Sequence, residues 1–249
     1  MTSLTELDHK YWGPVPEVDA YLKNRFFGGR VLDVGPGHSP LPWATDAVDF
    51  VDVPGLPNHV KFTKCDLTCE PLPFPDKAFD FVYCRHLLED SWNPFPICAE
   101  MSRVGRAGYV ETPSPIAELC RGVDGSSPPY RGYHHHRFIV WDHLGELHFV
   151  NKYPLVEYLR FDEGWMAFGL RYDAKYWNTY HLWTDVIRTR HIQSPLDFNV
   201  GENYGAVLNE ALQRSKHATD EFWTLIGCGA PKPSRQPYVM ALPKILTVN

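Results

Sequence analysis

The chain has 249 residues, of which 44% are hydrophobic, 14% aromatic and 22% charged, as is ordinary for a folded globular protein. Its 24 basic and 30 acidic residues give a formal net charge of −6, which disfavours nucleic-acid binding because phosphate contacts need clustered Lys and Arg. No apolar run approaches the roughly 18 residues of a membrane-spanning helix, and the N-terminus does not predict a signal peptide. Six cysteines without a Cys-x-x-Cys pair are typical of reduced thiols, so we expect a cytoplasmic protein.

The first half of the chain alternates short apolar runs with connections, a pattern typical of an α/β protein with a doubly wound, mostly parallel sheet. The pattern predicts a helix over 16–27 and a second over 86–103, broken near Pro94 and Pro96. The predicted strands are 30–34, 47–53, 60–64, 79–84 and 108–112. We expect a single domain over 1–249 with a core of about 16–115, and too short a connection from Gly37 to Ala47 for a full helix.

The second half follows a different pattern. Residues 113–136, rich in Pro, Gly, Ser and His, predict a covering loop, and 137–150 predict a β-hairpin. An aromatic set with helical spacing indicates packing in the core, and the alternative is that these side chains form the wall of a pocket. The set is Tyr172, Tyr176, Tyr180 and Trp183. Further predictions are a helix over 203–226, a late strand over 238–242 and a C-terminal substrate-capping region over 113–200.

The sharpest sequence signal is Val-Leu-Asp-Val-Gly-Pro-Gly, at the end of the first predicted strand. Gly35 and Gly37 permit turns barred to other residues and let a ligand approach the backbone closely. A nicotinamide-binding loop would carry a third glycine where this chain has Pro40, which disfavours an oxidoreductase. Asp33, two residues before the first glycine, can hold a positively charged amino-acid moiety.

A family resemblance extends over several segments in order: V-L-D-V-G-P-G, C-D-L at 65–67, P-L-P-F-P-D-K-A-F-D-F-V-Y at 71–83, R-H-L-L-E-D at 85–90 and E-M-S-R-V at 100–104. Together they resemble class I S-adenosylmethionine-dependent methyltransferases of the substrate-diverse type 11 group. The resemblance covers about residues 28–115 and implies a Rossmann-like sheet that binds S-adenosylmethionine. One departure is Gly-Arg-Ala-Gly at 105–108, where the family usually shows Lys-Pro-Gly-Gly.

The resemblance also implies cofactor contacts. An acid at the end of the second strand would bind the ribose hydroxyls through charge-assisted hydrogen bonds. Asp49 and Asp52 are both open, and we favour Asp49 because Pro40 and Pro42 indicate a shortened first helix. The other implied contacts are Asp33, Gly35 and Gly37 with the methionine portion, Asp66 and Leu67 with the adenine edge, and Arg85 near the sulfonium.

Histidines are the expected catalytic bases. Methyl transfer to a hydroxyl needs proton removal near neutral pH, and imidazole matches that range. His86 follows the fourth predicted strand, at the carboxyl edge of the sheet where ligands of open α/β sheets bind. His134 and His136 belong to a three-histidine run that could fold over the same edge. We expect His86 or this run to act as the base.

We expect no metal site, because adjacent side chains diverge and three consecutive histidines do not make a zinc triad. One alternative stays open. On a strand, His134 and His136 would share a face, and Glu111 or Asp142 could complete a metal site.

The whole sequence thus predicts an S-adenosylmethionine-dependent methyltransferase that acts on a small polar acceptor, with O-methylation of a sugar or another small molecule favoured. Nucleic-acid and membrane partners are not expected. The alternative is a non-catalytic binding subunit of the same fold. The intact glycine loop with Asp33 speaks against that alternative.

Overall fold

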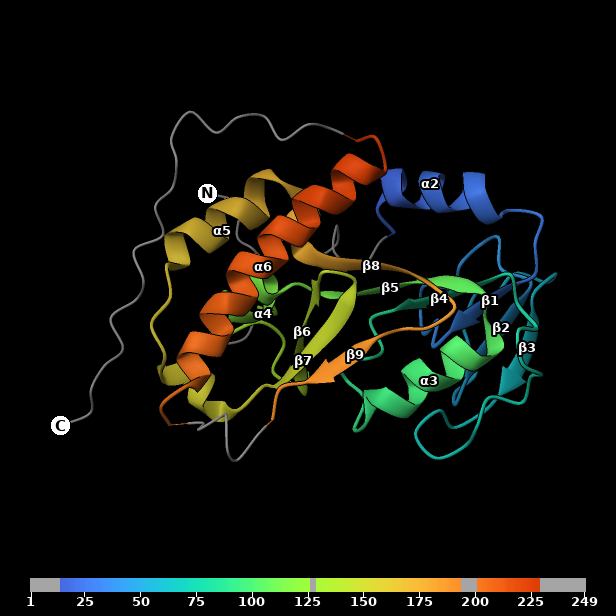
Figure 1. Cartoon of the computed structure of the whole chain (residues 1–249), viewed down its shortest axis with the longest axis horizontal. Helices are drawn as coiled ribbons and strands as arrows, with labels where there is room; N and C mark the ends of the chain where they lie inside the picture. Colours follow the sequence, from blue (N-terminus) through green and yellow to red (C-terminus); the bar gives the residue numbers. More distant parts are fainter. Residues whose placement is uncertain (1–13, 126–128, 194–200, 229–249) are drawn as a thin grey trace.

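The computed structural model describes residues 14–125, 129–193 and 201–228. Its main sheet has six strands in the order β3-β2-β1-β4-β5-β8 (Figure 1). Their bounds are β1 Val31–Val34, β2 Asp46–Asp49, β3 Lys61–Lys64, β4 Phe81–Arg85, β5 Ala107–Pro113 and β8 Asn178–Thr184. Only β8 is antiparallel to its neighbour. The predicted mostly parallel, Rossmann-like α/β sheet is therefore confirmed.

Prolines determine where the two helices of this half begin. Helix α2 is Pro16–Phe26 and helix α3 is Pro94–Val104, each with proline in its first turn, where a missing N–H costs nothing. The prediction that the second helix begins at residue 86 was wrong, because Asn93 takes the extended conformation that a following proline favours. Residues 86–93 instead form a turn that leads away from β4.

The connection from β1 to β2 contains turns and no helix along its whole described length, as its shortness predicted. Leu41, Trp43 and Ala44 are buried there and pack with Val18 and Leu22 of α2. Buried apolar side chains in this loop therefore cover the part of the sheet that a connecting helix would otherwise cover.

The second half of the chain forms a smaller sheet, β6-β7-β9, with helices packed against it. The predicted hairpin is confirmed, and its turn residues Leu144 and Gly145 have the positive φ values, 53° and 74°, of a two-residue hairpin turn. The predicted long helix is also confirmed as α6. The bounds are α4 Pro115–Leu119, β6 Phe138–His143, β7 Glu146–Asn151, η2 Pro154–Tyr158, α5 Glu163–Tyr172, η3 Ala174–Trp177, β9 Thr189–His191 and α6 Tyr204–Leu225.

The helical interpretation of the aromatic stretch was wrong. Tyr172 ends α5 and is 75% exposed, whereas Tyr180 and Trp183 lie on strand β8. Three positions apart on a strand, these two side chains point to opposite faces. Tyr180 stacks on Phe222 of α6, with ring centroids 4.8 Å apart, and Trp183 joins the cluster on the α3 face. Pairing with β5 overrides the helical spacing, and the expected burial holds for both strand residues.

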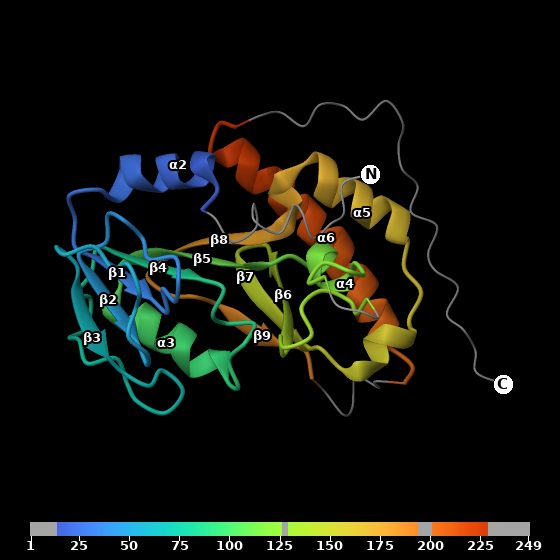
Figure 2. The same ribbon diagram turned by 180° about the vertical axis from the view of Figure 1, so that it is seen from behind.

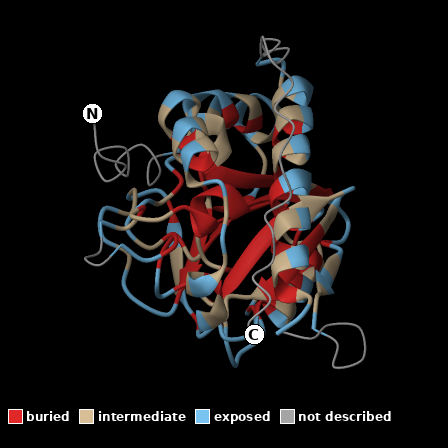
Figure 3. Cartoon of the chain, turned by 90° about the vertical axis from the view of Figure 1, so that its left-hand side faces the viewer, coloured by how far each residue is buried: buried red, intermediate tan, exposed pale blue. Residues whose placement is uncertain are grey.

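The two halves of the chain lie side by side, and β5 and β8 run between them (Figure 2). Buried strands occupy the centre, and the helices on the outside turn exposed faces to solvent (Figure 3). The predicted covering loop begins with the buried helix α4, and the predicted strand 238–242 lies outside the described residues. Among the helices described, none combines the length and apolar character that crossing a membrane requires.

Candidate functional site

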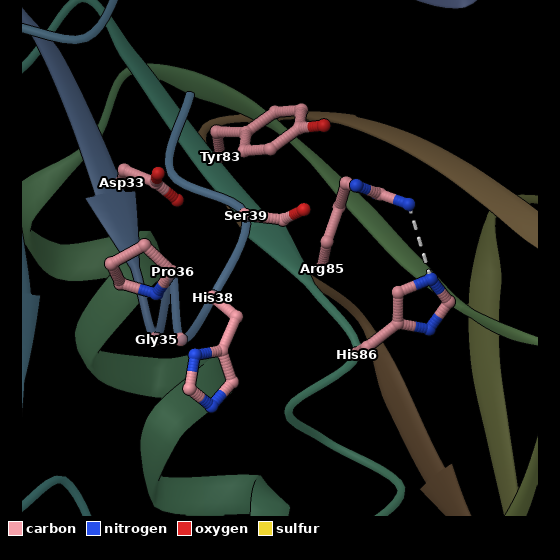
Figure 4. A pocket seen from close by; sticks show the side chains of 9 residues that line it. Asp33, Gly35, Pro36, His38, Ser39, Tyr83, Arg85 and His86 are labelled. Carbon is pink, nitrogen blue, oxygen red and sulfur yellow. Dashed lines mark hydrogen bonds between the residues drawn. The ribbon is translucent and has the colours of Figure 1, made fainter. Parts of the chain in front are cut away.

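A cavity of about 410 Å³ opens at the carboxyl ends of β1 and β4. In the sheet, β2 and β3 lie on one side of β1, whereas β4 and β5 lie on the other, so the strand order reverses between β1 and β4. The cavity lies at this point, which is the usual ligand position in open α/β sheets. Its volume falls in the range of small-molecule and cofactor sites, roughly 300–1,000 Å³. The lining residues are Asp33, Gly35, Pro36, Gly37, His38, Ser39, Tyr83, Arg85 and His86 (Figure 4).

The glycine loop forms one wall of the cavity. Gly35 and Gly37 have φ values of +66° and +51°, which non-glycine residues rarely adopt. A Cβ on Gly35 would lie 2.8 Å from a methyl carbon of Leu87, whereas a Cβ on Gly37 would meet open space. A side chain at Gly35 would therefore first strike Leu87.

Asp33 is buried near the end of β1, and its carboxylate accepts a hydrogen bond from the Leu41 backbone N–H at 2.7 Å. Burial raises the pKa of Asp33 to about 7, and the hydrogen bond from Leu41 and the charge of Arg85 offset only part of that rise. The cavity thus contains an acid that ionises near neutral pH, and a bound cation would favour its charged form.

Asp49 and Asp52 have different surroundings. Asp49 ends β2 and is buried, and it accepts hydrogen bonds from the backbone N–H groups of Gly37 at 3.2 Å and Val51 at 3.3 Å. Asp52 lies in the turn beyond β2 and is exposed. Neither is among the described residues that line the cavity, but Asp49 holds the glycine loop directly.

Asp66 and Leu67 follow β3 and lie away from this cavity. Asp66 is exposed and accepts hydrogen bonds from the hydroxyl and backbone N–H of Thr68, which lower the pKa of Asp66. Leu67 lines a separate hollow of about 350 Å³, together with Leu72 and Ile97. Among the described cavity-lining residues, neither Asp66 nor Leu67 appears.

Arg85 and His86 lie where β4 ends, opposite the glycine loop (Figure 4). Arg85 donates from Nε to Glu111 Oε1 at 2.8 Å, and both side chains are buried. His86 Nε2 lies 3.3 Å from Arg85 Nη2 and 3.5 Å from Glu111 Oε1, and His86 Nδ1 lies 3.3 Å from Glu89 Oε1. His86 also has a φ of +49°, a strained value of the kind found at functional sites.

The carboxylates determine the charge of this group. Burial would raise the pKa of Glu111, but the charge of Arg85 and the hydrogen bonds of His86 and Tyr109 outweigh it and hold the pKa at about 2. Burial would lower the pKa of His86, but Glu111 and Glu89 outweigh it and raise that pKa above its usual value. His86 is therefore a stronger base than an ordinary histidine.

His134 and His136 lie outside the set of described residues that line the cavity. His134 is 68% exposed and contacts Asp124 at 3.0 Å, whereas His136 is buried and its Nδ1 lies 2.5 Å from Glu118 Oε1. The alternative metal set, with Glu111 or Asp142, was wrong for the part of the chain that is described. Glu111 is bonded to Arg85, and Asp142 contacts His181 at 2.5 Å, because the sheets hold both acids elsewhere.

Sequence reasoning missed that Tyr83 lines the cavity and that Glu111 and Glu89 contact Arg85 and His86 beside it. The pairing of β4 with β5 sets Arg85 opposite Glu111. Opposite charges near the ends of two neighbouring parallel strands could have indicated this pair. Glu89 gave no such signal, because only the turn after β4 brings it beneath His86.

Residues 18–109 match the model of a family described as a methyltransferase domain. The match covers a little over a third of the chain, and it includes β1 to β4, α3 and the glycine loop. The resemblance to a methyltransferase domain is therefore confirmed for residues 18–109. A search of curated proteins found no match.

Several solved structures are similar over part of their length. One is the YcgJ protein from Bacillus subtilis, with 22% identity, a TM-score of 0.32 and coverage of 39% of this chain and 50% of that one. Another, described as an S-adenosylmethionine-dependent methyltransferase from Methanosarcina mazei, has 19% identity, a TM-score of 0.34 and coverage of 41% and 59%. The chain thus spans about half the length of such structures.

Proposed function

We propose that this chain, whose residues 18–109 match a methyltransferase domain, is an enzyme that transfers the methyl group of S-adenosylmethionine to a small polar acceptor. One observation carries the proposal. The glycine loop, Asp33 and His86 line a single cavity at the carboxyl edge of the parallel sheet. This edge is where open α/β sheets bind their ligands.

On this proposal the glycine loop and Asp33 bind the methionine portion, with the Asp33 carboxylate facing the ammonium group. Asp49 is the ribose ligand, and its bond to the Gly37 N–H positions the loop beside it. Asp66 and Leu67 would reach the adenine edge from the turn after β3, where Leu67 lines a separate hollow.

The acceptor is proposed to be a hydroxyl of a small molecule such as a sugar. The acceptor oxygen forms a bond to the methyl carbon while the carbon–sulfur bond breaks, and the sulfur keeps the bonding electron pair. The hydroxyl proton passes to His86, whose raised pKa suits a general base. Alignment of the acceptor with the sulfonium supplies much of the remaining acceleration.

His86 is the preferred base over His134 and His136. It lines the cavity, whereas His136 is buried against Glu118 and His134 is turned to solvent at Asp124. His86→Asn is the matched variant, because asparagine tolerates a positive φ better than most residues. We expect turnover on an identified acceptor to fall by about 10²–10⁴-fold, with unchanged affinity for S-adenosylhomocysteine.

The pH profile gives a second readout for His86. The base must be neutral, so turnover should rise with pH through a value above the ordinary histidine pKa, and His86→Asn should remove that rise. A variant that keeps the full rate and the same pH profile would refute the role of His86.

Calorimetry with S-adenosylhomocysteine tests the cofactor site separately. Asp49→Ala should weaken binding by about 1.5–3 kcal/mol, since it removes a charged hydrogen-bond acceptor, and Asp52→Ala is the matched control on the same turn. The reverse order would transfer the ribose role to Asp52. Absence of binding by the unaltered chain would overturn the proposed function.

The alternative function is a binding subunit that holds the cofactor without catalysis. Tight binding of S-adenosylhomocysteine together with absence of methyl transfer across a panel of hydroxyl, amine and thiol acceptors would favour it.

All six cysteines are free thiols, which suits a reducing compartment, and we include a cytoplasmic location in the proposal.

A further inference from the structure

A second cluster of chemically active side chains lies outside the cavity. Asp90, in the turn after β4, meets His135 and His136 of the histidine run. Their potential ligand atoms all lie within 4.8 Å of one another. His135 Nε2 is 3.9 Å from Asp90 Oδ2, and His136 Nε2 is 4.0 Å from Asp90 Oδ1.

The surroundings of His136 determine which of its nitrogens faces this cluster. Its Nδ1 lies 2.5 Å from the buried carboxylate of Glu118, which also accepts a hydrogen bond from Lys152 Nζ. In its neutral form, an imidazole that donates its Nδ1 proton to a carboxylate carries its lone pair on Nε2, the atom that faces Asp90, and a bound cation favours this form over the protonated one. This carboxylate–histidine arrangement is the usual support behind a metal-binding imidazole.

Glu89 provides an independent observation. It is 1% exposed, and neither oxygen of its carboxylate has a hydrogen-bond partner among the described residues. Its backbone carbonyl accepts hydrogen bonds from the N–H groups of Arg137 and Phe138, which hold it against the end of the histidine run. His86 is within ion-pair distance on one side, and Asp90 follows directly in the chain. A cation bound at the neighbouring cluster would add to the stabilisation that His86 gives this buried carboxylate.

We propose that Asp90, His135 and His136 bind a divalent transition-metal cation, with Zn²⁺ as the reference ion. Two imidazoles and one carboxylate form a donor set that zinc takes in sites with an open position. Ligand bonds of roughly 2.0–2.2 Å require the three side chains to draw together. Asp90 and His135 are 43% and 49% exposed, so they have room to move toward the buried His136.

Direct titration of the purified chain, without a histidine tag and after removal of metal with a chelator, tests this site. Calorimetry with Zn²⁺ and visible absorption with Co²⁺ should each report one ion per chain. Asp90→Asn and His135→Ala should each weaken Zn²⁺ binding at least tenfold, because each removes one ligand. Both residues are partly exposed, so these variants should fold, and circular dichroism verifies that they do.

His134→Ala is the matched control, since it removes an adjacent, more exposed histidine that the proposal leaves out of the site. It should bind Zn²⁺ as tightly as the unaltered chain. The proposal is overturned if no ion binds, if the folded Asp90→Asn and His135→Ala variants keep full affinity, or if His134→Ala loses affinity equally. The readout is metal binding alone, so it does not depend on methyltransferase activity.

Discussion

Asp33 is a cavity residue whose charge changes near neutral pH. Burial raises its pKa to about 7, so the carboxyl group is partly neutral there in the empty site. The ammonium group of S-adenosylhomocysteine interacts more favourably with the carboxylate. We therefore expect calorimetric affinity to rise from about pH 6 to about pH 8, and Asp33→Asn to abolish most of that rise.

The raised pKa of Asp33 also makes the stability of the folded chain depend on pH, in a direction that can be worked out. A carboxyl group whose folded pKa exceeds its unfolded value makes folding less favourable as pH rises from the unfolded pKa through the folded one. Asp33→Asn should therefore flatten the dependence of the unfolding free energy on pH between about 4 and 7. If the affinity and the unfolding free energy of Asp33→Asn depend on pH as those of the unaltered chain do, a group other than Asp33 causes both pH dependences.

At the scale of the element, strand β5 depends on the glycines that precede and begin it. A Cβ on Gly108 would lie 2.4 Å from the Val82 carbonyl oxygen and 2.5 Å from the Trp183 ring, and Gly105 is similarly close to Val82 and Trp183. Glycine at these two positions therefore lets β8 place a tryptophan against the strand pair. The Val82 carbonyl group and the packed Trp183 ring cannot move easily to make room for an added Cβ.

Gly108→Ala should consequently lower the free energy of unfolding by about 1–3 kcal/mol, measured by urea denaturation. Gly164→Ala in α5 is the control, because its new Cβ would have only an ordinary contact, 3.5 Å from Asp162 Oδ1. Alanine there should be neutral or stabilising by up to about 1 kcal/mol. Equal effects of the two substitutions would contradict the packing argument.

At the scale of the whole molecule, the ion pair of Glu118 and Lys152 ties helix α4 to the chain that leaves β7. Glu118 is completely buried, and Lys152 Nζ also donates to the Tyr133 carbonyl oxygen at 2.7 Å. Burial alone would raise the pKa of Glu118, but the charges of Lys152 and His136 outweigh it and lower that pKa. The ionised form of Glu118 is thus part of the folded structure.

Lys152→Met should lower the free energy of unfolding by about 3–5 kcal/mol, because it leaves a buried carboxylate with His136 as its remaining charged partner. Lys216→Met is the control, since its pair with Asp220 is partly exposed and should contribute less than about 1 kcal/mol. Because the folded pKa of Glu118 is lowered, its contribution is present above the unfolded pKa and lost as pH falls below it. Equal decreases in the free energy of unfolding in the two variants would show that the buried ion pair contributes no more than the partly exposed one.

Features that depend on a few adjacent residues could be predicted from the sequence alone. The glycine loop, the proline-started helix α2, the hairpin over β6 and β7 and the long helix α6 all follow from local backbone preferences. Such preferences act within one turn or one strand and need no distant partner. They were sufficient to predict the parallel sheet, whereas the class of cofactor was implied by the family resemblance of the motifs.

Contacts between distant segments were not readable in this way. Tyr180 and Trp183 lie on a strand because β5 offers an unpaired edge, which outweighs their helical spacing. Asp90 reaches the histidine run because a turn and a loop about 45 residues apart meet beside the sheet, and Glu111 reaches Arg85 and His86 because β5 pairs with β4. Burial and pairing energies from such encounters exceed local propensity, so the environment of His86 and the proposed metal cluster emerge only when the chain is folded.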